Sequence, residues 1–369
     1  MRDATILTGF LGSGKTTLLS RILTQSSFPP SAVLVNEFGE AGIDNALLRF
    51  STERVAVLAN GCICCAVRED VEEAVRLLME QEDNGETPPF EHLFIETSGL
   101  ADPAKLIQTF SASPVLRSRF KLRCVAATVD AALGAQTLSR FTEAARQVAL
   151  ADMVILTKTD LLEAGRSMAP LLDQIRSVNP GVYTTVATRH ALPDALTPRL
   201  LDEAQTDTRD PAALFMRGIA SRDGLKVGHL LDTGIASFCV TMPEAIDWTA
   251  FGIWLTWLLH RHGASILRVK GLLKVAQCQG PVAFHAVQHM VYPPEHLDDW
   301  PTDDDTSRLV FIVKDLPPEL VERSLRAFNK LTTVEEAYSR EWTRHKDIGA
   351  GTTVRGQPVR RPSTPRWMR

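Results

Sequence analysis

The chain lacks the features that mark membrane, disulfide-rich and nucleic-acid-binding proteins. Its longest apolar stretch, residues 250–259, is far shorter than the ~20 residues that a membrane-spanning helix needs. Six cysteines in 369 residues are too few and too unevenly placed for a disulfide framework. The formal net charge of −4 provides no basic field for nucleic acid. We therefore expect a cytoplasmic protein without a membrane or nucleic-acid partner.

A glycine-rich motif near the start predicts a phosphate-binding loop. It follows a short apolar run, precedes a helix-compatible run and reads Gly9-Phe-Leu-Gly12-Ser13-Gly14-Lys15-Thr16. Glycines let several backbone N–H groups point at phosphate oxygens, and the following helix adds its positive N-terminus. Lys15 is placed to reach the outer phosphates and Thr16 to ligate Mg²⁺, with Thr17 next in the binding segment. The motif predicts that the chain binds a nucleoside triphosphate with Mg²⁺.

Short apolar runs alternate with amphipathic segments up to about residue 187. Seven of these runs are predicted as strands: Ala4–Thr8, Ala32–Asn36, Val55–Leu58, His92–Glu96, Leu122–Asp130, Met153–Thr157 and Val182–Val186. Strands buried on both faces have continuous apolar sequences, and intervening helices return the chain in parallel. The pattern predicts an α/β fold with a doubly wound, mostly parallel sheet. Ligands in such sheets bind beyond the carboxyl ends of the strands.

The second half of the chain predicts a connector, a smaller domain and a tail. Four runs read as strands and two as helices: Ser237–Met242, Ser265–Val275, Pro281–Gln288 and Ser307–Val313, with Trp248–His260 and Pro318–Phe328. This pattern favours an α+β domain with an antiparallel sheet. We therefore predict a nucleotide domain at 1–187, a connector at 188–232, an α+β domain at 233–332 and a basic, mobile tail at 333–369.

Two further motifs begin where predicted strands end. Glu96 ends an apolar strand, so its carboxylate is placed to hold Mg²⁺ through water or to orient the attacking water. Asp102 precedes a proline, which is typical of a helix start. The second motif is Thr157-Lys158-Thr159-Asp160. An aspartate at position 160 can accept hydrogen bonds from the guanine N1–H and exocyclic amine, while the stem of Lys158 covers the base.

The second motif leaves the choice of base open. Adenine offers no such pair of donors, and a carboxylate buried without them is unfavourable, which favours GTP. The usual first residue of this motif is asparagine, whereas this chain has Thr157. We therefore predict GTP as the nucleotide, with ATP as the alternative.

Three of the six cysteines cluster at Cys62, Cys64 and Cys65, directly after the turn-forming pair Asn60-Gly61. Three thiolates at one point suit Zn²⁺ or a similar ion and leave a fourth position vacant for another ligand. Glu37 and Glu40, from the loop expected to respond to the γ-phosphate, are candidates for that position or for a second weak site. Inert burial or a redox pair are the alternatives for the cysteines.

Along the chain, the phosphate loop is followed by Asn36-Glu37-Phe38-Gly39-Glu40, the cysteine segment, Glu96-Thr97-Ser98-Gly99 and Thr157-Lys158-Thr159-Asp160. This set in this order resembles the CobW family of GTPases, relatives of the nickel chaperones for hydrogenase and urease. The resemblance covers the whole nucleotide domain and extends to the C-terminal domain through Leu267-Arg-Val-Lys-Gly271 and the strand around Leu309-Val-Phe-Ile-Val313. It implies a G domain that couples GTP binding and hydrolysis to metal delivery. No arginine finger can be identified from the sequence, so we expect slow intrinsic turnover. It also implies a client metalloprotein as partner and allows a homodimer.

We therefore expect a nucleotide-gated metallochaperone in which Lys15, Thr16 and Glu96 serve hydrolysis. Zn²⁺ is the preferred metal because of the three thiolates and the zinc-handling branch that the chain resembles. Co²⁺, for cobalamin synthesis or nitrile hydratase activation, is the alternative metal. Two alternative functions stay open, a zinc-sensing regulatory GTPase without a delivery step and a small-molecule kinase whose cysteines are structural.

Overall fold

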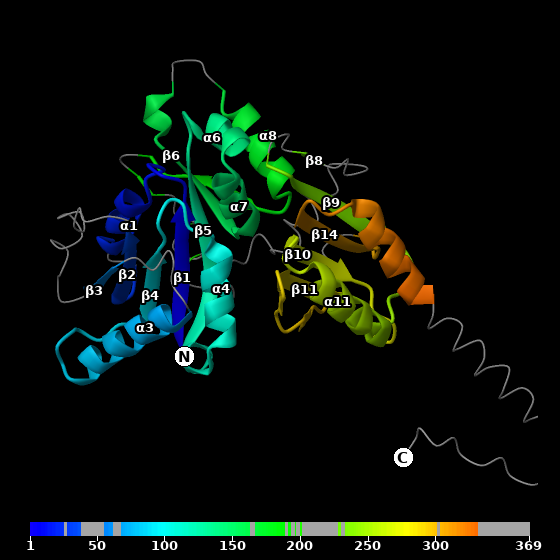
Figure 1. Cartoon of the computed structure of the whole chain (residues 1–369), viewed down its shortest axis with the longest axis horizontal. Coiled ribbons are helices and arrows are strands. Elements are labelled where there is room, and N and C mark those ends of the chain that lie inside the picture. Colours follow the sequence, from blue (N-terminus) through cyan, green and yellow to red (C-terminus); the bar gives the residue numbers. More distant parts are fainter. Residues whose placement is uncertain are drawn as a thin grey trace, which may run out of the picture.

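The first sheet is built from parallel strands in the order β3-β2-β4-β1-β5-β6-β7 (Figure 1). The structure is a computed structural model. It describes residues 1–25, 28–37, 55–61, 68–162, 167–188, 191–192, 196, 200, 228–229, 233–300 and 303–330. The predicted tail and most of the predicted connector lie outside these residues.

Helices alternate with the strands of this sheet. The strands are β1 (Arg2–Gly9), β2 (Ser31–Glu37), β3 (Val55–Gly61), β4 (His92–Glu96), β5 (Phe120–Asp130), β6 (Met153–Thr157) and β7 (Tyr183–Val186). The helices are α1 (Lys15–Leu23), α3 (Arg68–Asp83), α4 (Pro103–Ala112), α5 (Pro114–Arg119), α6 (Gly134–Arg140), α7 (Thr142–Leu150) and α8 (Ala169–Val178). The predicted doubly wound α/β fold is confirmed.

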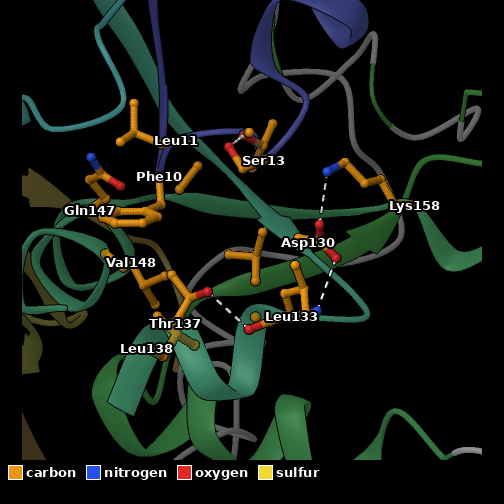
Figure 2. Close-up of a pocket in the computed structure, with 16 residues that line it drawn as sticks. Phe10, Leu11, Ser13, Asp130, Leu133, Thr137, Leu138, Gln147, Val148 and Lys158 are labelled. Atoms are coloured by element: carbon orange, nitrogen blue, oxygen red, sulfur yellow. Dashed lines mark hydrogen bonds and ion pairs between the residues drawn. The ribbon is translucent and has the colours of Figure 1, made fainter. Parts of the chain in front are cut away.

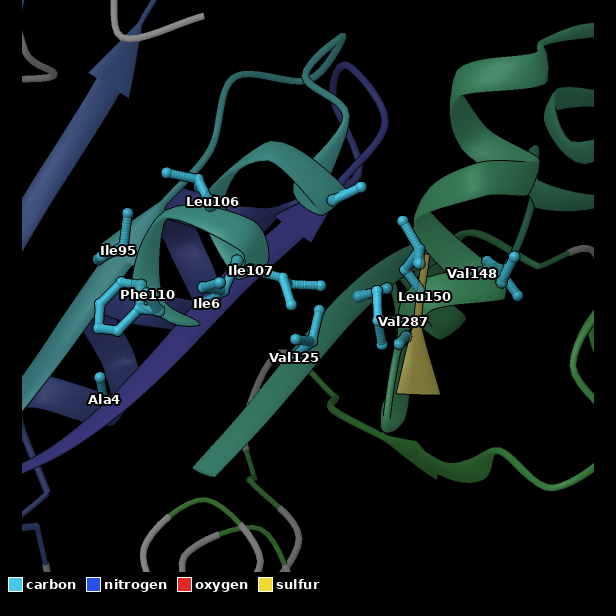
Figure 3. Close-up of a cluster of buried hydrophobic side chains, with 14 of the residues drawn as sticks. Ala4, Ile6, Ile95, Leu106, Ile107, Phe110, Val125, Val148, Leu150 and Val287 are labelled. Atoms are coloured by element: carbon cyan, nitrogen blue, oxygen red, sulfur yellow. The ribbon is translucent and has the colours of Figure 1, made fainter. Parts of the chain in front are cut away.

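Apolar side chains cover the sheet on both faces. Leu19 and Ile22 of α1 pack on one face, in a buried cluster with Val33 of β2. Ile107 of α4 and Val148 of α7 belong to the cluster on the opposite face, which Figure 3 shows. Since both faces are covered, β4 and β6, which each have a neighbouring strand on both sides, are buried along their whole length. This explains why their sequences are continuous apolar runs.

Helix starts follow the local sequence. Asp102 precedes α4 and its side chain accepts a hydrogen bond from the backbone N–H of Ala104 over 3.0 Å. Pro103 occupies the first position of the helix, where a missing N–H has no cost. The predicted capping role of Asp102 is therefore confirmed, and six residues separate the end of β4 from the start of α4.

The second sheet is antiparallel, as predicted, and has the order β12-β11-β10-β14-β9-β8, with β13 paired to β11. Its strands are β8 (Gly228–His229), β9 (Ile235–Met242), β10 (Ile266–Leu273), β11 (Val282–Val287), β12 (Met290–Val291), β13 (Glu295–His296) and β14 (Ser307–Lys314). Helix α11 (Trp248–His262) and the helix at 318–330 accompany it. Trp254 is fully buried in the apolar cluster of this domain, and its indole N–H donates to the Ser324 hydroxyl over 2.9 Å.

The two sheets meet where α7 and α8 contact β9 and β10 (Figure 1). Val287 of β11 joins the apolar cluster of the first domain and lies beside Leu150 at the end of α7 (Figure 3). The guanidinium of Arg268, whose side chain is 2% exposed, donates to the Leu150 carbonyl over 2.5 Å and pairs with the Asp152 carboxylate. Lys270 adds a second contact to the same carboxylate at 3.2 Å. A partly buried ion cluster thus joins the domains.

Burial and charge act in opposite directions on the carboxylate of this cluster. Burial alone raises the pKa of Asp152, but the positive charges of Arg268 and Lys270 and the N–H of Val125 outweigh it and hold the pKa well below its usual range. The nearby His285 ring is stacked on Tyr292 at 4.5 Å, and burial together with the same cations lowers its pKa. The cluster therefore contains an ionised aspartate and a neutral histidine at neutral pH.

The helices in the described part of the chain are all too short or too polar to cross a bilayer.

Candidate nucleotide-binding site

The phosphate-binding motif forms the turn between β1 and α1. Gly14 precedes the helix with φ 91°, a left-handed conformation that favours glycine. A Cβ at Gly9 would lie 2.3 Å from the Thr128 hydroxyl, so this position also excludes larger residues. The Ser13 hydroxyl forms a 2.6 Å hydrogen bond with the same Thr128 side chain. The turn is therefore fixed to the carboxyl end of β5 as well as to its own strand.

The predicted catalytic residues come together beside this turn. The Thr16 hydroxyl donates a 2.5 Å hydrogen bond to the carboxylate of Glu96, which is 2% exposed at the end of β4. The Lys15 ammonium donates to the carbonyl of Gly9 at 2.9 Å and to that of Phe10 at 3.4 Å. An aliphatic hydroxyl next to a carboxylate is an oxygen donor set that fits Mg²⁺, which prefers hard oxygen ligands.

The loop after Glu96 is held by α7, a contact that the sequence did not predict. The side-chain amide of Gln147, which is 1% exposed, donates to the carbonyls of Gly99 at 3.0 Å and Ala101 at 3.2 Å. Arg146 pairs with Asp102 at 3.2 Å. Two consecutive residues of α7 therefore fix the segment that follows the strand-end carboxylate.

Thr157 takes part in the phosphate-binding turn. Its hydroxyl donates to the Ser13 carbonyl at 2.7 Å, and its side chain lies within 3.6 Å of the position that a Cβ at Gly14 would take. The residue that departs from the usual asparagine thus still links the predicted base-binding segment to the phosphate loop. Asp160 is exposed on the following 3-10 helix, η2 (Thr159–Leu161).

A cavity of about 240 Å³ opens beside the phosphate loop (Figure 2). The start of the loop at Phe10 and Leu11 and helix α7 at Val148 both line it. Its charged groups are Asp130 and Lys158, which form an ion pair of 2.9 Å. Neither the cavity nor this pair was predicted, although each of the two residues lies at or directly after a predicted strand end.

The predicted metal-binding residues fall largely outside the described residues. Cys62, Cys64, Cys65 and Glu40 lie in segments that the structure does not describe, and only the backbone of Glu37 is described. Among the residues that are described, no group of three or more His, Cys, Asp or Glu side chains is arranged to hold a metal ion. The backbone places Glu37, the last residue of β2, opposite Gly61, the last residue of β3.

A parallel sheet with a glycine-rich turn, a helix N-terminus and a strand-end carboxylate at its carboxyl edge defines a P-loop nucleotide-binding protein. Residues 3–185 match the model of the CobW/HypB/UreG nucleotide-binding domain, and residues 235–329 match that of the cobalamin synthesis protein cobW C-terminal domain. The chain belongs to the CobW family of P-loop GTPases.

Individual relatives span nearly the whole chain. The zinc chaperone YjiA of Escherichia coli is 33% identical over 328 residues, which are 88% of this chain and 98% of the relative. The zinc chaperone CobW of Pseudomonas aeruginosa is 32% identical over 87% of this chain and 90% of its own length. The crystal structure of zinc-bound YjiA GTPase from E. coli superposes with a TM-score of 0.64 at 26% identity, covering 89% of this chain and 98% of that structure.

Proposed function

We propose that the chain is a GTP-hydrolysing metallochaperone that holds Zn²⁺ on Cys62, Cys64 and Cys65 and delivers it to a client metalloprotein. The order of the strands carries the proposal. β3, which leads directly into Cys62, is three strands from β1 in the order β3-β2-β4-β1. At ~4.8 Å between neighbouring strands, the cysteine segment leaves the sheet about 14 Å from the start of the phosphate loop, on the same edge.

The proposed nucleotide site uses the turn at Gly9, Gly12, Ser13 and Gly14 with Lys15, Thr16 and Thr17. Glu96 and Thr16 would hold Mg²⁺, which would supply positive charge between the outer phosphates. Within the protein, Lys15 would exchange its carbonyl contacts for the phosphates, and Glu96 would orient the attacking water. Thr157, Lys158 and Asp160 would bind the base, and guanine is favoured because a carboxylate such as that of Asp160, on η2 just after β6, can accept from both of its donors.

The proposed cargo site rests on the chemistry of three thiolates. Zn²⁺ favours sulfur ligands in tetrahedral geometry, and three protein ligands leave one position from which an ion can be passed on. The relatives that match nearly the whole chain are named zinc chaperones, which supports the same ion. Glu37 and Glu40 are proposed for the fourth position, because β2 ends beside β3.

In the proposed cycle, bound GTP draws the segment with Glu37 and Glu40 toward the cysteines. The filled fourth position holds Zn²⁺ more tightly. Hydrolysis removes the γ-phosphate contacts, so the fourth ligand is lost and the ion is free to move to a client. A nucleotide changes ion affinity only as far as it favours one of the two arrangements, which makes the coupling measurable.

Transfer to a chelator tests the cycle. The protein loaded with one Zn²⁺ is mixed with a fluorescent zinc chelator, and the transfer rate is measured with GTP, GDP or a non-hydrolysable GTP analogue. We expect slow transfer with the analogue and faster transfer during GTP turnover. Equal rates with all three nucleotides would contradict delivery gated by hydrolysis. A variant with serine at positions 62, 64 and 65 is expected to carry no transferable ion.

A further inference from the structure

Asp130 and Lys158 meet because two neighbouring parallel strands end in register. β5 and β6 pair so that Asp130 lies opposite Thr157, the residue before Lys158. The Lys158 ammonium donates to one carboxylate oxygen of Asp130 at 2.9 Å, as the dashed line in Figure 2 shows. The pair therefore lies at the carboxyl edge of the sheet, next to the phosphate loop.

Asp130 is itself held in place by the backbone. Its other carboxylate oxygen accepts hydrogen bonds from the N–H groups of Ala132 at 2.8 Å and Leu133 at 3.0 Å. Burial acts to raise the pKa of Asp130, but the hydrogen bonds from Lys158 and from the two N–H groups outweigh it and lower the pKa. One oxygen thus anchors the residue, and the second faces the lysine as an ionised acceptor.

Lys158 has a left-handed backbone conformation that few lysines adopt. Its φ is 55°, and it initiates the 3-10 helix that carries Asp160. Such left-handed conformations cost free energy and persist where surrounding contacts fix them. A lysine side chain also loses considerable rotamer entropy when it is fixed in one direction. The ion pair with Asp130 is the contact that gives the side chain a single direction.

We propose that Asp130 is a positioning residue for base recognition, which acts by holding the stem of Lys158 in the orientation that lies against guanine. This inference rests on the proposed guanine site at Lys158 and Asp160. A lysine held in advance loses less entropy when the nucleotide binds, so the affinity for the base rises without any contact between Asp130 and the ligand.

A double-mutant cycle on the full chain tests this role, with GDP affinity measured by calorimetry. Asp130→Asn keeps an oxygen for the two backbone N–H groups but replaces the acceptor of Lys158 with an amide. We expect about fivefold weaker GDP binding, the scale of a partly exposed ion pair. Lys158→Met keeps the stem and removes the charge. Adding Asp130→Asn to Lys158→Met is expected to cause no further loss, since Asp130 acts through the lysine.

A structural role for Asp130 in its own turn predicts a different result. In that case, Asp130→Asn weakens GDP binding by the same factor whether or not Lys158 is present, and this additivity would overturn the proposal. Asp304→Asn is the matched control, because Asp304 also accepts from a backbone N–H, that of Thr306, and pairs with a cation, Arg308, but in the second domain. We expect this control to bind GDP like the native chain.

Inosine diphosphate separates this role from that of Asp160. Inosine lacks the exocyclic amine of guanine, so Asp160→Asn is expected to reduce the preference for GDP over the inosine nucleotide. Asp130→Asn is expected to weaken both nucleotides equally, because the lysine stem contacts the face of the base. If Lys158→Met and Asp160→Asn both leave GDP affinity unchanged, the proposed guanine site fails. If these two variants weaken binding and Asp130→Asn does not, the role of Asp130 alone fails.

Discussion

The hydroxyl of Thr157 donates a hydrogen bond to the carbonyl oxygen of Ser13 at 2.7 Å and so joins the end of β6 to the phosphate loop. The two residues are 144 positions apart in the sequence. Asparagine, the usual residue at this position of the motif, also carries a hydrogen-bond donor. The departure from the usual motif therefore preserves the donor, and the segment proposed to bind the base remains connected to the phosphate loop.

Thr157→Val tests this connection, because valine has nearly the same shape and no hydroxyl. The Ser13 carbonyl then loses a buried hydrogen bond, which is worth about 1 kcal/mol. We expect about fivefold weaker GDP binding as the loop loses its fixed position. Thr256→Val is the control, since that hydroxyl donates to the Gly252 carbonyl within α11 of the other domain. Unchanged GDP affinity in Thr157→Val would show that the hydrogen bond has no part in the site.

Glu96→Gln tests the strand-end carboxylate. The amide has the same size and still accepts from the Thr16 hydroxyl, but it lacks the negative charge that would hold Mg²⁺ or orient water. We expect the kcat for GTP to fall about a hundredfold, the usual contribution of such a group. GDP affinity measured without Mg²⁺ should stay close to that of the native chain. Glu143→Gln, at an exposed position in the first turn of α7, should leave both values unchanged.

Arg268→Met tests the ion cluster between the domains. In the variant, the Asp152 carboxylate loses its closest cation. This loss lowers the free energy of unfolding by about 3 kcal/mol. We expect this loss in the free energy of unfolding measured with urea. Arg76→Met is the matched control, because Arg76 pairs with Glu73 on the exposed face of α3. Its effect should stay within about 0.5 kcal/mol. Equal effects of the two variants would mean that the ion cluster contributes little to stability.

His92 makes the stability of the chain depend on pH. Burial at 1% exposure lowers the pKa of His92 from 6.5 to about 4, and its ring contacts Thr5 at 3.1 Å and Phe94 at 4.5 Å. Between these two pKa values the unfolded chain binds a proton that the folded chain does not, so stability falls as the pH falls from 6.5 toward 4.

His92→Gln removes this titration. The native chain should lose about 2 kcal/mol more than the variant between pH 7 and pH 5, from one histidine that is neutral only when folded. Urea unfolding at both pH values measures the difference. His285 has a lowered pKa for a similar reason and contributes equally to both proteins, so it cancels. The same pH dependence in native chain and variant would contradict the assignment to His92.

The strands that are buried along their whole length were predicted well from the sequence. The bounds of β4 and β6 are those expected from the apolar runs at His92–Glu96 and Met153–Thr157. The prediction for β5 began at Leu122, two residues late, because Lys121 is exposed and interrupts the apolar pattern. The predicted strand at Ser265–Val275 was too long by one residue at its start and two at its end, where the buried Val275 pairs with Ile246 outside the sheet.

Side-chain contacts between distant segments could not be predicted in the same way. Arg268 lies 116 positions from Asp152, and an arginine in a strand pattern is usually read as a solvent-facing residue. Gln147 likewise fits the polar face of an amphipathic helix, although it is buried against the loop at Gly99. Asp130 and Lys158 had a usable signal, because each stands at or directly after the end of a strand predicted for the same parallel sheet, whose carboxyl ends lie on one edge.

The equilibrium affinity for Zn²⁺ in different nucleotide states tests the central proposal most directly. It would be measured without nucleotide, with GDP and with a non-hydrolysable GTP analogue, on the native chain and on the variant with serine at positions 62, 64 and 65. We expect the analogue to raise zinc affinity at least tenfold over GDP in the native chain, and the variant to lose both the tight site and its dependence on nucleotide. Zinc affinity that is the same in all three states, or unchanged by the loss of the three cysteines, would contradict the account.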